Sequence, residues 1–235
     1  MKKVKNRKWW FKGLKGFLKI FIRRKKYIFL GEGFDEEPAI ILSNHVGAIG
    51  PLSHELYFPE PFRFWGTYEM NSGIKSVYKY LTEVYYTKKK HWKPFPAKLF
   101  CLLAAPLANL FYKGLNLIST YPDYRFRKTL IESLKTVKEG QSLIIFPEDS
   151  ENGYYDEMTK FYAGFVTFAQ ATLKRGMDLK IYKMYLRKKE KIVVVDKPIR
   201  FSELMSQFDS KQALADAVCE RVNELGTMDI QKEEK

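Results

Sequence analysis

The sequence predicts an α/β fold, because short strand-like runs alternate with longer helix-like segments along its 235 residues. The strand-like runs are apolar and end in turn residues, as in "PAIILSNH" (38–45) and "QSLIIFPEDS" (141–150). The helix-like segments place apolar residues at helical spacing, and one of them stops at Gly140. A hydrophobic content of 46% and this length suit one domain with a sizeable core.

The expected elements follow one another without an internal repeat or a linker. We predict strands within residues 26–34, 38–45, 62–70, 113–120, 141–150, 178–186 and 191–199. We predict helices within residues 71–86, 99–112, 121–140, 158–176 and 201–225, the last of them broken within. The basic, proline-containing stretch 87–96 is expected to be a loop.

The longest apolar run, residues 99–112, is shorter than the ~20 residues that a membrane span needs and contains Pro106 and Asn109. We therefore expect a buried or interfacial helix pair there, and no span. The two cysteines, Cys101 and Cys219, lie far apart and outside any metal-type spacing. Their number and placement indicate a reducing cytoplasm and no disulfide framework.

The net charge of +14 belongs to the start of the chain. Residues 1–26 hold twelve Lys or Arg and no acid, which leaves 29 bases against 27 acids in the remainder. On a helical wheel, Trp10, Leu14, Phe17, Leu18 and Phe21 fall on one side, and Lys8, Lys12, Lys15, Lys19 and Arg23 on the other. Residues 1–27 are thus predicted to form a basic amphipathic membrane-surface helix, and residues 28–235 the α/β domain.

This leader pattern is typical of a helix in a membrane interface, with aromatic side chains below the headgroups and lysines facing anionic lipid. The side chains expected to bind the membrane are Trp9, Trp10, Phe17, Phe21, Lys12, Lys15 and Lys19. Two other interpretations stay open: a structural helix docked on the body, and a nucleic-acid-binding segment. Because the body shows no second basic patch of this density and no nucleic-acid motif, we expect an anionic membrane surface as partner, and no nucleic acid.

Two stretches that directly follow predicted strands carry the residues best suited to chemistry. They are "SNHVGAIGP" (43–51) and "FPEDSENGY" (146–154). In α/β sheets, reactive groups lie on loops just beyond strand ends. We therefore expect a functional site at these two loops.

At these residues the sequence resembles the glycerolipid acyltransferases, the family that includes lysophosphatidate and glycerol-3-phosphate acyltransferases. That family carries Asn-His-x-x-x-x-Asp after one strand and Phe-Pro-Glu-Gly-Thr-Arg after a later one. Here "NHVGAIG" matches the first block, "KGLNLISTYPD" an intermediate block and "IIFPEDSENG" the later one, and the resemblance covers roughly residues 28–200. It implies a mixed, mostly parallel sheet flanked by helices.

The sequence departs from the family pattern at several positions. Gly50 stands where the family has the aspartate, and Thr120 stands where it has an arginine. Residues 149–151, Asp-Ser-Glu, replace Gly-Thr-Arg. The loss of arginine and the gain of acids favour a neutral, amine-bearing or zwitterionic acceptor over a small phosphomonoester.

The resemblance implies transfer of an acyl group from a thioester, either acyl-CoA or an acyl carrier protein, to a hydroxyl of a glycerolipid-type acceptor. His45 would act as general base, oriented by a backbone carbonyl, Glu148 or Asp149, with no metal and no permanently bound cofactor. Gly47 and Gly50 would let backbone N–H groups approach the developing oxyanion. The expected substrate-binding residues are Asn44, Gly47, Gly50, Pro147, Asp149, Ser150, Arg125 and Arg127.

Two alternatives to an enzyme stay open. The first is a lipid or acyl-thioester binding protein on the same fold, with its site eroded at Gly50, Thr120 and Glu151. The second is a basic interaction protein whose leader binds anionic polymers. For the enzyme we expect a peripheral position on the cytoplasmic face of the membrane.

Overall fold

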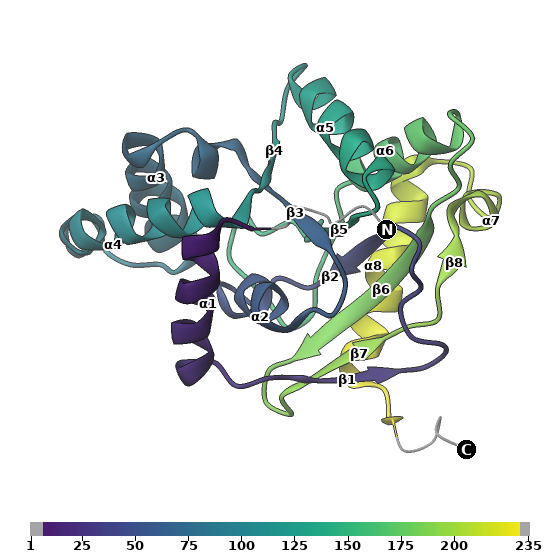
Figure 1. The fold of residues 1–235 in the computed structure, drawn as a ribbon, viewed down its shortest axis with the longest axis horizontal. Helices are drawn as coiled ribbons and strands as arrows, with labels where there is room; N and C mark the ends of the chain where they lie inside the picture. The colour runs from purple at the N-terminus through teal and green to yellow at the C-terminus, as the bar shows by residue number, and fades with distance from the viewer. Residues whose placement is uncertain (1–6, 231–235) are drawn as a thin grey trace.

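The computed structural model describes residues 7–230, which form an eight-stranded sheet covered by helices on both faces (Figure 1). The strand order is β1-β7-β6-β2-β5-β3-β4, and β8 pairs with β6. Five of the seven strand pairings are parallel, and only the two that join β6 to β7 and to β8 are antiparallel. The prediction of a mixed, mostly parallel α/β sheet flanked by helices is confirmed.

The strands lie close to the predicted ranges. They are β1 (Lys26–Phe29), β2 (Ala39–Ser43), β3 (Phe62–Thr67), β4 (Ile118–Thr120), β5 (Ser142–Ile145), β6 (Lys180–Arg187), β7 (Ile192–Val195) and β8 (Ile199–Arg200). The helices are α1 (Trp9–Phe21), α2 (Ile49–Tyr57), η1 (Tyr68–Asn71), α3 (Ile74–Lys79), η2 (Tyr80–Lys89), α4 (Pro94–Leu115), α5 (Phe126–Lys138), α6 (Gly164–Leu173), α7 (Phe201–Met205) and α8 (Lys211–Thr227). Here η1 is a 3-10 helix and η2 a π-helix.

Alternation along the central strands divides the core between the two faces of the sheet. In β2, Ile40 and Leu42 point into a cluster covered by α5, α6, α7 and α8. Ala39 and Ile41 point into the opposite cluster, which contains Phe11 of α1 and the end of α4. Because β2 is buried on both faces, its sequence reads as a continuous apolar run rather than an alternating one.

The parallel strands place several loops at one edge of the sheet. β2, β5, β3 and β4 run in the same direction and are consecutive neighbours, so their carboxyl ends meet there. His45 follows β2 and Glu148 follows β5, which puts the two predicted loops on adjacent strands. This neighbour relation positions the candidate site.

The segment between β3 and β4 forms a helical unit of its own. α3 and η2 pack against α4 around a small cluster made of Val77, Leu81, Cys101 and Ala105. The expected helix pair over residues 99–112 is wrong: α4 is one continuous helix of 22 residues that includes Pro106. Of the two expected settings, the buried one is also wrong, since most large apolar side chains of α4 are exposed, and the interfacial one stays a prediction. Among the described residues, α4 is the one helix long and apolar enough to cross a membrane.

The leader helix α1 docks on the body through one side. Phe11 is fully buried and its ring lies where a side chain on Gly114 would be, because a Cβ there would come within 2.0 Å of the Phe11 ring. Trp9, Phe17 and Phe21 remain exposed. The helix therefore docks on the body, as the structural interpretation expected. It also keeps exposed aromatic side chains, as the membrane interpretation expected. Leader residues 1–6 and the terminal residues 231–235 lie outside the described part of the chain.

Two basic side chains of the leader neutralise a buried acid of the body. The Glu55 carboxylate, on α2, forms ion pairs with the Arg7 guanidinium at 2.6 Å and the Lys15 ammonium at 2.9 Å. Removing one side of such a buried pair costs roughly 3–5 kcal/mol, because the other charge is left uncompensated. Lys15 therefore serves the fold, although the sequence assigned it to the membrane. The predicted division at residue 27 falls inside β1.

Candidate active site

The chain after β2 is held in place by the side chain of Asn44. Its Nδ2 donates to the Leu186 carbonyl at 3.2 Å, and its Oδ1 accepts from the Leu186 N–H at 2.7 Å. Asn44 thus extends the β2–β6 pairing by one step through its amide group. Because both ends of the amide bond the Leu186 backbone, Asn44 fixes the chain that leads to His45.

The turn after His45 is tight and left-handed. Val46 has φ 48° and Gly47 has φ 62°, so two consecutive residues occupy the left-handed region before α2 begins. A β-branched residue is rarely found there, and it costs of the order of 1–3 kcal/mol. The turn brings the start of α2 close to the backbone of His45.

Gly50 lies in the first turn of α2, directly against His45. A Cβ at this position would come within 2.1 Å of the His45 carbonyl oxygen. Close backbone approach, rather than an unusual φ, is the reason for glycine here. No side chain, an aspartate included, fits between α2 and this carbonyl in the observed arrangement.

Glu148 is placed by a short bridge beyond β5. The Pro147 carbonyl accepts from the Tyr162 N–H at 2.8 Å, and the Asp149 N–H donates to the Lys160 carbonyl at 2.9 Å. Between them the Glu148 side chain is buried. Burial raises the pKa of Glu148 to about 7, against the smaller opposing effects of the His45 backbone N–H and the Lys89 ammonium.

The His45 ring lies between two aromatic rings. Its centroid is 4.8 Å from that of Phe146 and 4.6 Å from that of Tyr154, with which it stacks. Burial, together with the Lys89 charge, lowers the pKa of His45 to about 3, so the imidazole is neutral at pH 7. A neutral ring has a free lone pair and is able to accept a proton.

Three buried side-chain atoms lack a hydrogen-bond partner within the described residues: Nδ1 of His45, Oε1 of Glu148 and Oγ of Ser53 on α2. The first two lie on the two loops, where the backbone N–H of His45 faces the Glu148 carboxylate. Buried polar atoms in native proteins are nearly always satisfied, so each exception calls for an explanation. Two exceptions on adjacent loops are the strongest sign of a site in this structure.

Sequence reasoning missed a cation that reaches this edge from η2. The Lys89 ammonium lies 2.6 Å from the Ser150 hydroxyl and 4.9 Å from the Tyr154 ring centroid. Lys90 approaches Gly47, and its ammonium lies 6.0 Å from the same ring. The stretch was expected to be a loop, but η2 extends through Lys89 and delivers these side chains. Its run of three lysines, 88–90, was the available signal.

The two predicted arginines lie further along the same edge. Arg125 forms an ion pair with Asp123 at 2.7 Å, and its guanidinium lies 4.9 Å from the Tyr68 ring centroid and 4.8 Å from that of Tyr121. Arg127 is exposed at the start of α5. These side chains follow β3 and β4, two and three strands away from β2. At ~4.8 Å per strand, β3 and β4 lie roughly 10–14 Å from β2. Arg125 packs with Tyr68 and Tyr121 there.

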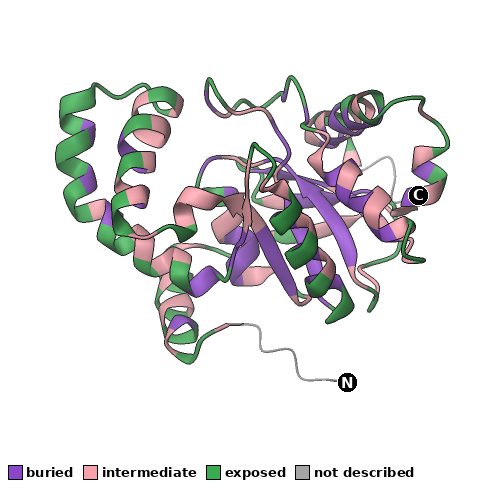
Figure 2. Ribbon diagram, turned by 90° about the horizontal axis from the view of Figure 1, so that it is seen from above, coloured by how far each residue is buried: buried purple, intermediate pink, exposed green. Residues whose placement is uncertain are grey.

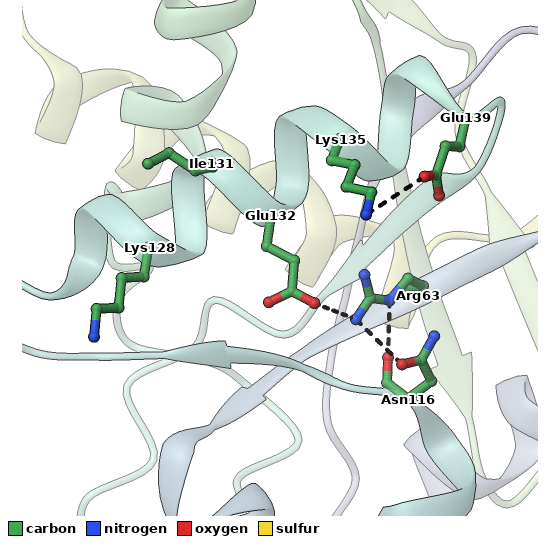
Figure 3. A pocket seen from close by; sticks show the side chains of 7 residues that line it. All are labelled: Arg63, Asn116, Lys128, Ile131, Glu132, Lys135 and Glu139. Atoms are coloured by element: carbon green, nitrogen blue, oxygen red, sulfur yellow. Dashed lines mark hydrogen bonds and ion pairs between the residues drawn. The ribbon is translucent and has the colours of Figure 1, made fainter.

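A polar pocket lies near the opposite ends of β3 and β4 (Figure 3). At its centre the Arg63 guanidinium donates to Glu132 at 2.6 Å, to the Asn116 carbonyl at 2.8 Å and to Thr136 at 3.1 Å. These bonds tie α5 to the end of α4, and we assign Arg63 a structural role. Across residues 7–230, no group of three or more His, Cys, Asp or Glu is arranged to hold a metal ion.

Comparison with solved structures adds a likeness of fold. No protein-family profile and no curated protein matches the sequence. A solved structure that the chain resembles is the crystal structure of the 1-acyl-sn-glycerophosphate (LPA) acyltransferase PlsC from Thermotoga maritima. The two chains are 12% identical, the match covers 93% of this chain and 90% of that one, and the TM-score is 0.49. A likeness at this level concerns the path of the chain, so the function below is argued from the site residues.

Proposed function

We propose that the protein transfers an acyl group from a thioester to a hydroxyl of a glycerolipid-type acceptor, with His45 as general base. The observation that carries the proposal is the pair of unsatisfied buried atoms, Nδ1 of His45 and Oε1 of Glu148, on adjacent strands of one sheet edge. A polar reactant placed between the two loops would satisfy both. The sequence blocks around these residues supply the reaction class by resemblance.

In the proposed step, His45 takes the hydroxyl proton while the acceptor oxygen attacks the thioester carbonyl carbon. The new ester C–O bond forms, the C–S bond breaks, and the proton passes from the imidazolium to the departing thiolate. A positioned base of this kind contributes roughly 10²–10⁴-fold to the rate. Ionised Glu148 supports the step, because its negative charge stabilises the transient imidazolium.

Lys89 offers a positive charge to the reactants. Burial lowers its pKa, and the acids at 148, 149 and 151 oppose that effect, so the ammonium lies among carboxylates beside Ser150. An anionic group that pairs with Lys89 would remove a charge that depresses the pKa of His45, and would make the imidazole a stronger base. The site thus admits an acceptor that carries a phosphate, which the missing arginine and the added acids had argued against. In this proposal Gly47, Asp149 and Ser150 line the acceptor site, and the backbone N–H of Gly47 faces the oxyanion.

The remaining expectations belong to the same proposal. The donor is an acyl-CoA or an acyl carrier protein, and no cofactor is held permanently. The protein works as a peripheral protein on the cytoplasmic face of an anionic membrane, with no nucleic-acid partner. Support comes from the exposed Trp9, Phe17 and Phe21 of α1 and from the basic leader.

A lipid or acyl-thioester binding protein without turnover is the second candidate. Two observations favour it: Tyr154 stacks on the His45 ring, and the contact at Gly50 excludes an orienting carboxylate from that position. In this case the aromatic rings would contact a bound acyl chain, and the imidazole would take no part in a reaction. Both candidates bind lipid or an acyl thioester, but only the acyltransferase turns over the thioester.

The deciding experiment incubates the purified protein with a labelled acyl thioester and a total lipid extract, and identifies by mass which species gains the acyl group. We expect an acylated glycerolipid with the native protein and loss of turnover, with retained thioester binding, for His45→Ala. The matched control is His91→Asn, since His91 is exposed and asparagine tolerates its φ of 56°. Binding without any acylated product, in native protein and variants alike, would establish the second candidate instead.

A further inference from the structure

The outer side of α4 is an apolar surface that nothing in the described chain covers. Phe95 and Leu103 are each 79% exposed and Leu107 is 70% exposed. Leu99, Leu102 and Leu110 are also exposed, and Figure 2 shows the helix at one extremity of the molecule, mostly exposed. Soluble proteins rarely expose a contiguous apolar patch of this kind without a binding partner.

The opposite side of α4 is fixed to the protein. Ala97, Cys101 and Ala105 are buried against α3 and η2. Both ends of the helix return to the body: four residues separate its start from η2, and two separate its end from β4 in the sheet. A helix packed along one side and tethered at both ends to the same domain cannot cross a bilayer alone. It can lie in the plane of the interface with its free side in the acyl region.

The charge around this surface matches an anionic lipid. From residue 84 to residue 122 the chain contains six lysines and no acidic residue. Lys93 and Lys98 near the start of α4 and Lys113 near its end are all exposed. Trp92, beside the Phe100 ring at a centroid distance of 5.5 Å, is partly exposed at the start of the helix. Tryptophan and lysine at the rim of an apolar surface are typical of interfacial helices.

The α4 surface adjoins the leader helix. Phe11 of α1 packs on Gly114 and lies 5.4 Å from the Phe111 ring, so the two helices meet near the end of α4. α1 carries further exposed apolar side chains, among them Phe17, Ile20 and Phe21. The end of α4 thus contacts a second helix that also has exposed apolar side chains.

We propose that α4 is a membrane-inserting element that lies in the plane of an anionic lipid surface, with the side bearing Phe95, Leu103 and Leu107 below the headgroups. The assignment goes beyond acyl transfer and holds whether or not the protein turns over. It also gives the candidate site a route to lipid. η2 and the turn after it carry Lys89 to Ser150 and Trp92 to the start of α4, within four residues of chain.

The test uses the full chain and sedimentation with vesicles of phosphatidylglycerol and phosphatidylcholine. We expect Leu103→Glu/Leu107→Glu to weaken vesicle binding by about tenfold or more, because two charges would enter the acyl region. The matched control is Ile131→Glu, an apolar residue of α5 that is 59% exposed. It should bind like the native protein. Because all three side chains are exposed, the thermal midpoints should stay close together.

Two further arms separate the alternatives. In Phe17→Glu/Phe21→Glu the leader is disabled while α4 is intact, and we expect partial loss of binding. Unchanged binding by the Leu103→Glu/Leu107→Glu protein, with binding abolished by the leader variant, would overturn the role of α4. If the α4 variant instead converts a dimer to a monomer by light scattering and still binds vesicles, the surface joins two copies of the chain and the proposal is wrong. Vesicle binding is read without any acyl donor, so failure here leaves acyl transfer untouched.

Discussion

His45 and His54 form a natural comparison, because the two histidines lie near the same strand end and share an aromatic neighbour. The Phe146 ring centroid is 4.8 Å from that of His45 and 6.2 Å from that of His54. Burial lowers the pKa of each to about 3, so both rings are neutral at pH 7. By pKa alone, the two side chains look alike.

Their hydrogen bonding separates them. His54 is fully buried on α2, with Nδ1 at 3.0 Å from the Tyr27 hydroxyl and Nε2 at 3.4 Å from the Ser43 hydroxyl. His45 is half-buried in the loop, and its Nδ1 has no partner within the described residues. A perturbed pKa therefore does not distinguish a site from a core in this protein, whereas an unsatisfied polar atom at a loop does.

Gly50 lies on α2, the helix of His54, and touches the backbone of His45. We expect its substitution to have the largest effect on stability. Gly50→Asp introduces a carboxylate five residues after His45, but its Cβ would meet the His45 carbonyl oxygen at 2.1 Å. We expect a loss of stability on the order of 3 kcal/mol or more, since α2 must move off the His45 loop and carry His54 with it. Turnover should fall rather than rise. Urea unfolding and the acyl-transfer assay measure both effects.

Gly50→Ala is the control for this substitution, because it adds the same Cβ without a carboxylate. It should be destabilised by nearly as much as Gly50→Asp. An aspartate variant that folds as well as the native protein and turns over faster would mean that the loop opens easily, contrary to the contact described here.

Replacing each histidine by alanine gives the direct comparison. His54→Ala leaves the Tyr27 hydroxyl unpaired and opens a cavity, so we expect a loss of about 2–4 kcal/mol in the free energy of unfolding. His45→Ala removes a ring that makes no side-chain hydrogen bond through Nδ1, and should cost about 1 kcal/mol or less. Urea titrations at pH 7 decide between these values. Equal losses at the two positions would remove the distinction between core and site.

Much of the fold was predictable from the sequence, because the strands are buried on both faces and end at clear turn residues. "AIIL" before Ser43 and "LII" before Phe146 predict β2 and β5. The same reasoning failed for α4, where Pro106 was taken as a break although proline in an exposed helix can be accommodated by a local bend. Apolar composition alone also does not distinguish a core helix from a surface helix.

For the site, the sequence indicated which loops matter but not what each residue does. His45 and Glu148 follow strands that the sequence suggested, and the parallel topology brings them together. Asn44 and Lys15 were assigned to ligands, yet the structure shows both bonded to the protein itself. Lys89 was missed because a contact between residues 89 and 150 depends on how η2 crosses the sheet edge, and no local pattern encodes that crossing.

The comparison of site and core also applies to Glu148, whose buried Oε1 has no hydrogen-bond partner within the described residues. Its folded pKa of about 7 lies above the ordinary 4.5, so the folded protein holds the proton more tightly than the unfolded chain. The carboxyl therefore costs stability increasingly as the pH rises from 4.5 to about 7, up to roughly 3 kcal/mol above that range. We expect Glu148→Gln to be more stable than the native protein by about 1–3 kcal/mol at pH 8, with little difference at pH 4.5. Urea unfolding at the two pH values measures this.

A pH-independent effect of Glu148→Gln would show that the carboxyl is solvated and not held between the loops. The paired control is Glu139→Gln, an exposed acid at the end of α5. It should change the free energy of unfolding by about 0.5 kcal/mol or less at either pH.

The smallest expected effect is a change in the pKa of one histidine. It distinguishes His45 from His54 because only His45 has a lysine charge nearby that lowers its pKa. Lys89 lowers the pKa of His45, whereas burial alone lowers the pKa of His54. In Lys89→Met the pKa of His45 should rise, yet stay below 6.5, because burial is the larger of the causes. The pKa of His54 should not move, so it serves as an internal control in the same titration of ring proton NMR signals. If both values rise together, the cause is loosening of the fold rather than loss of a charge, and Lys89 would lose its assigned place beside the reactants.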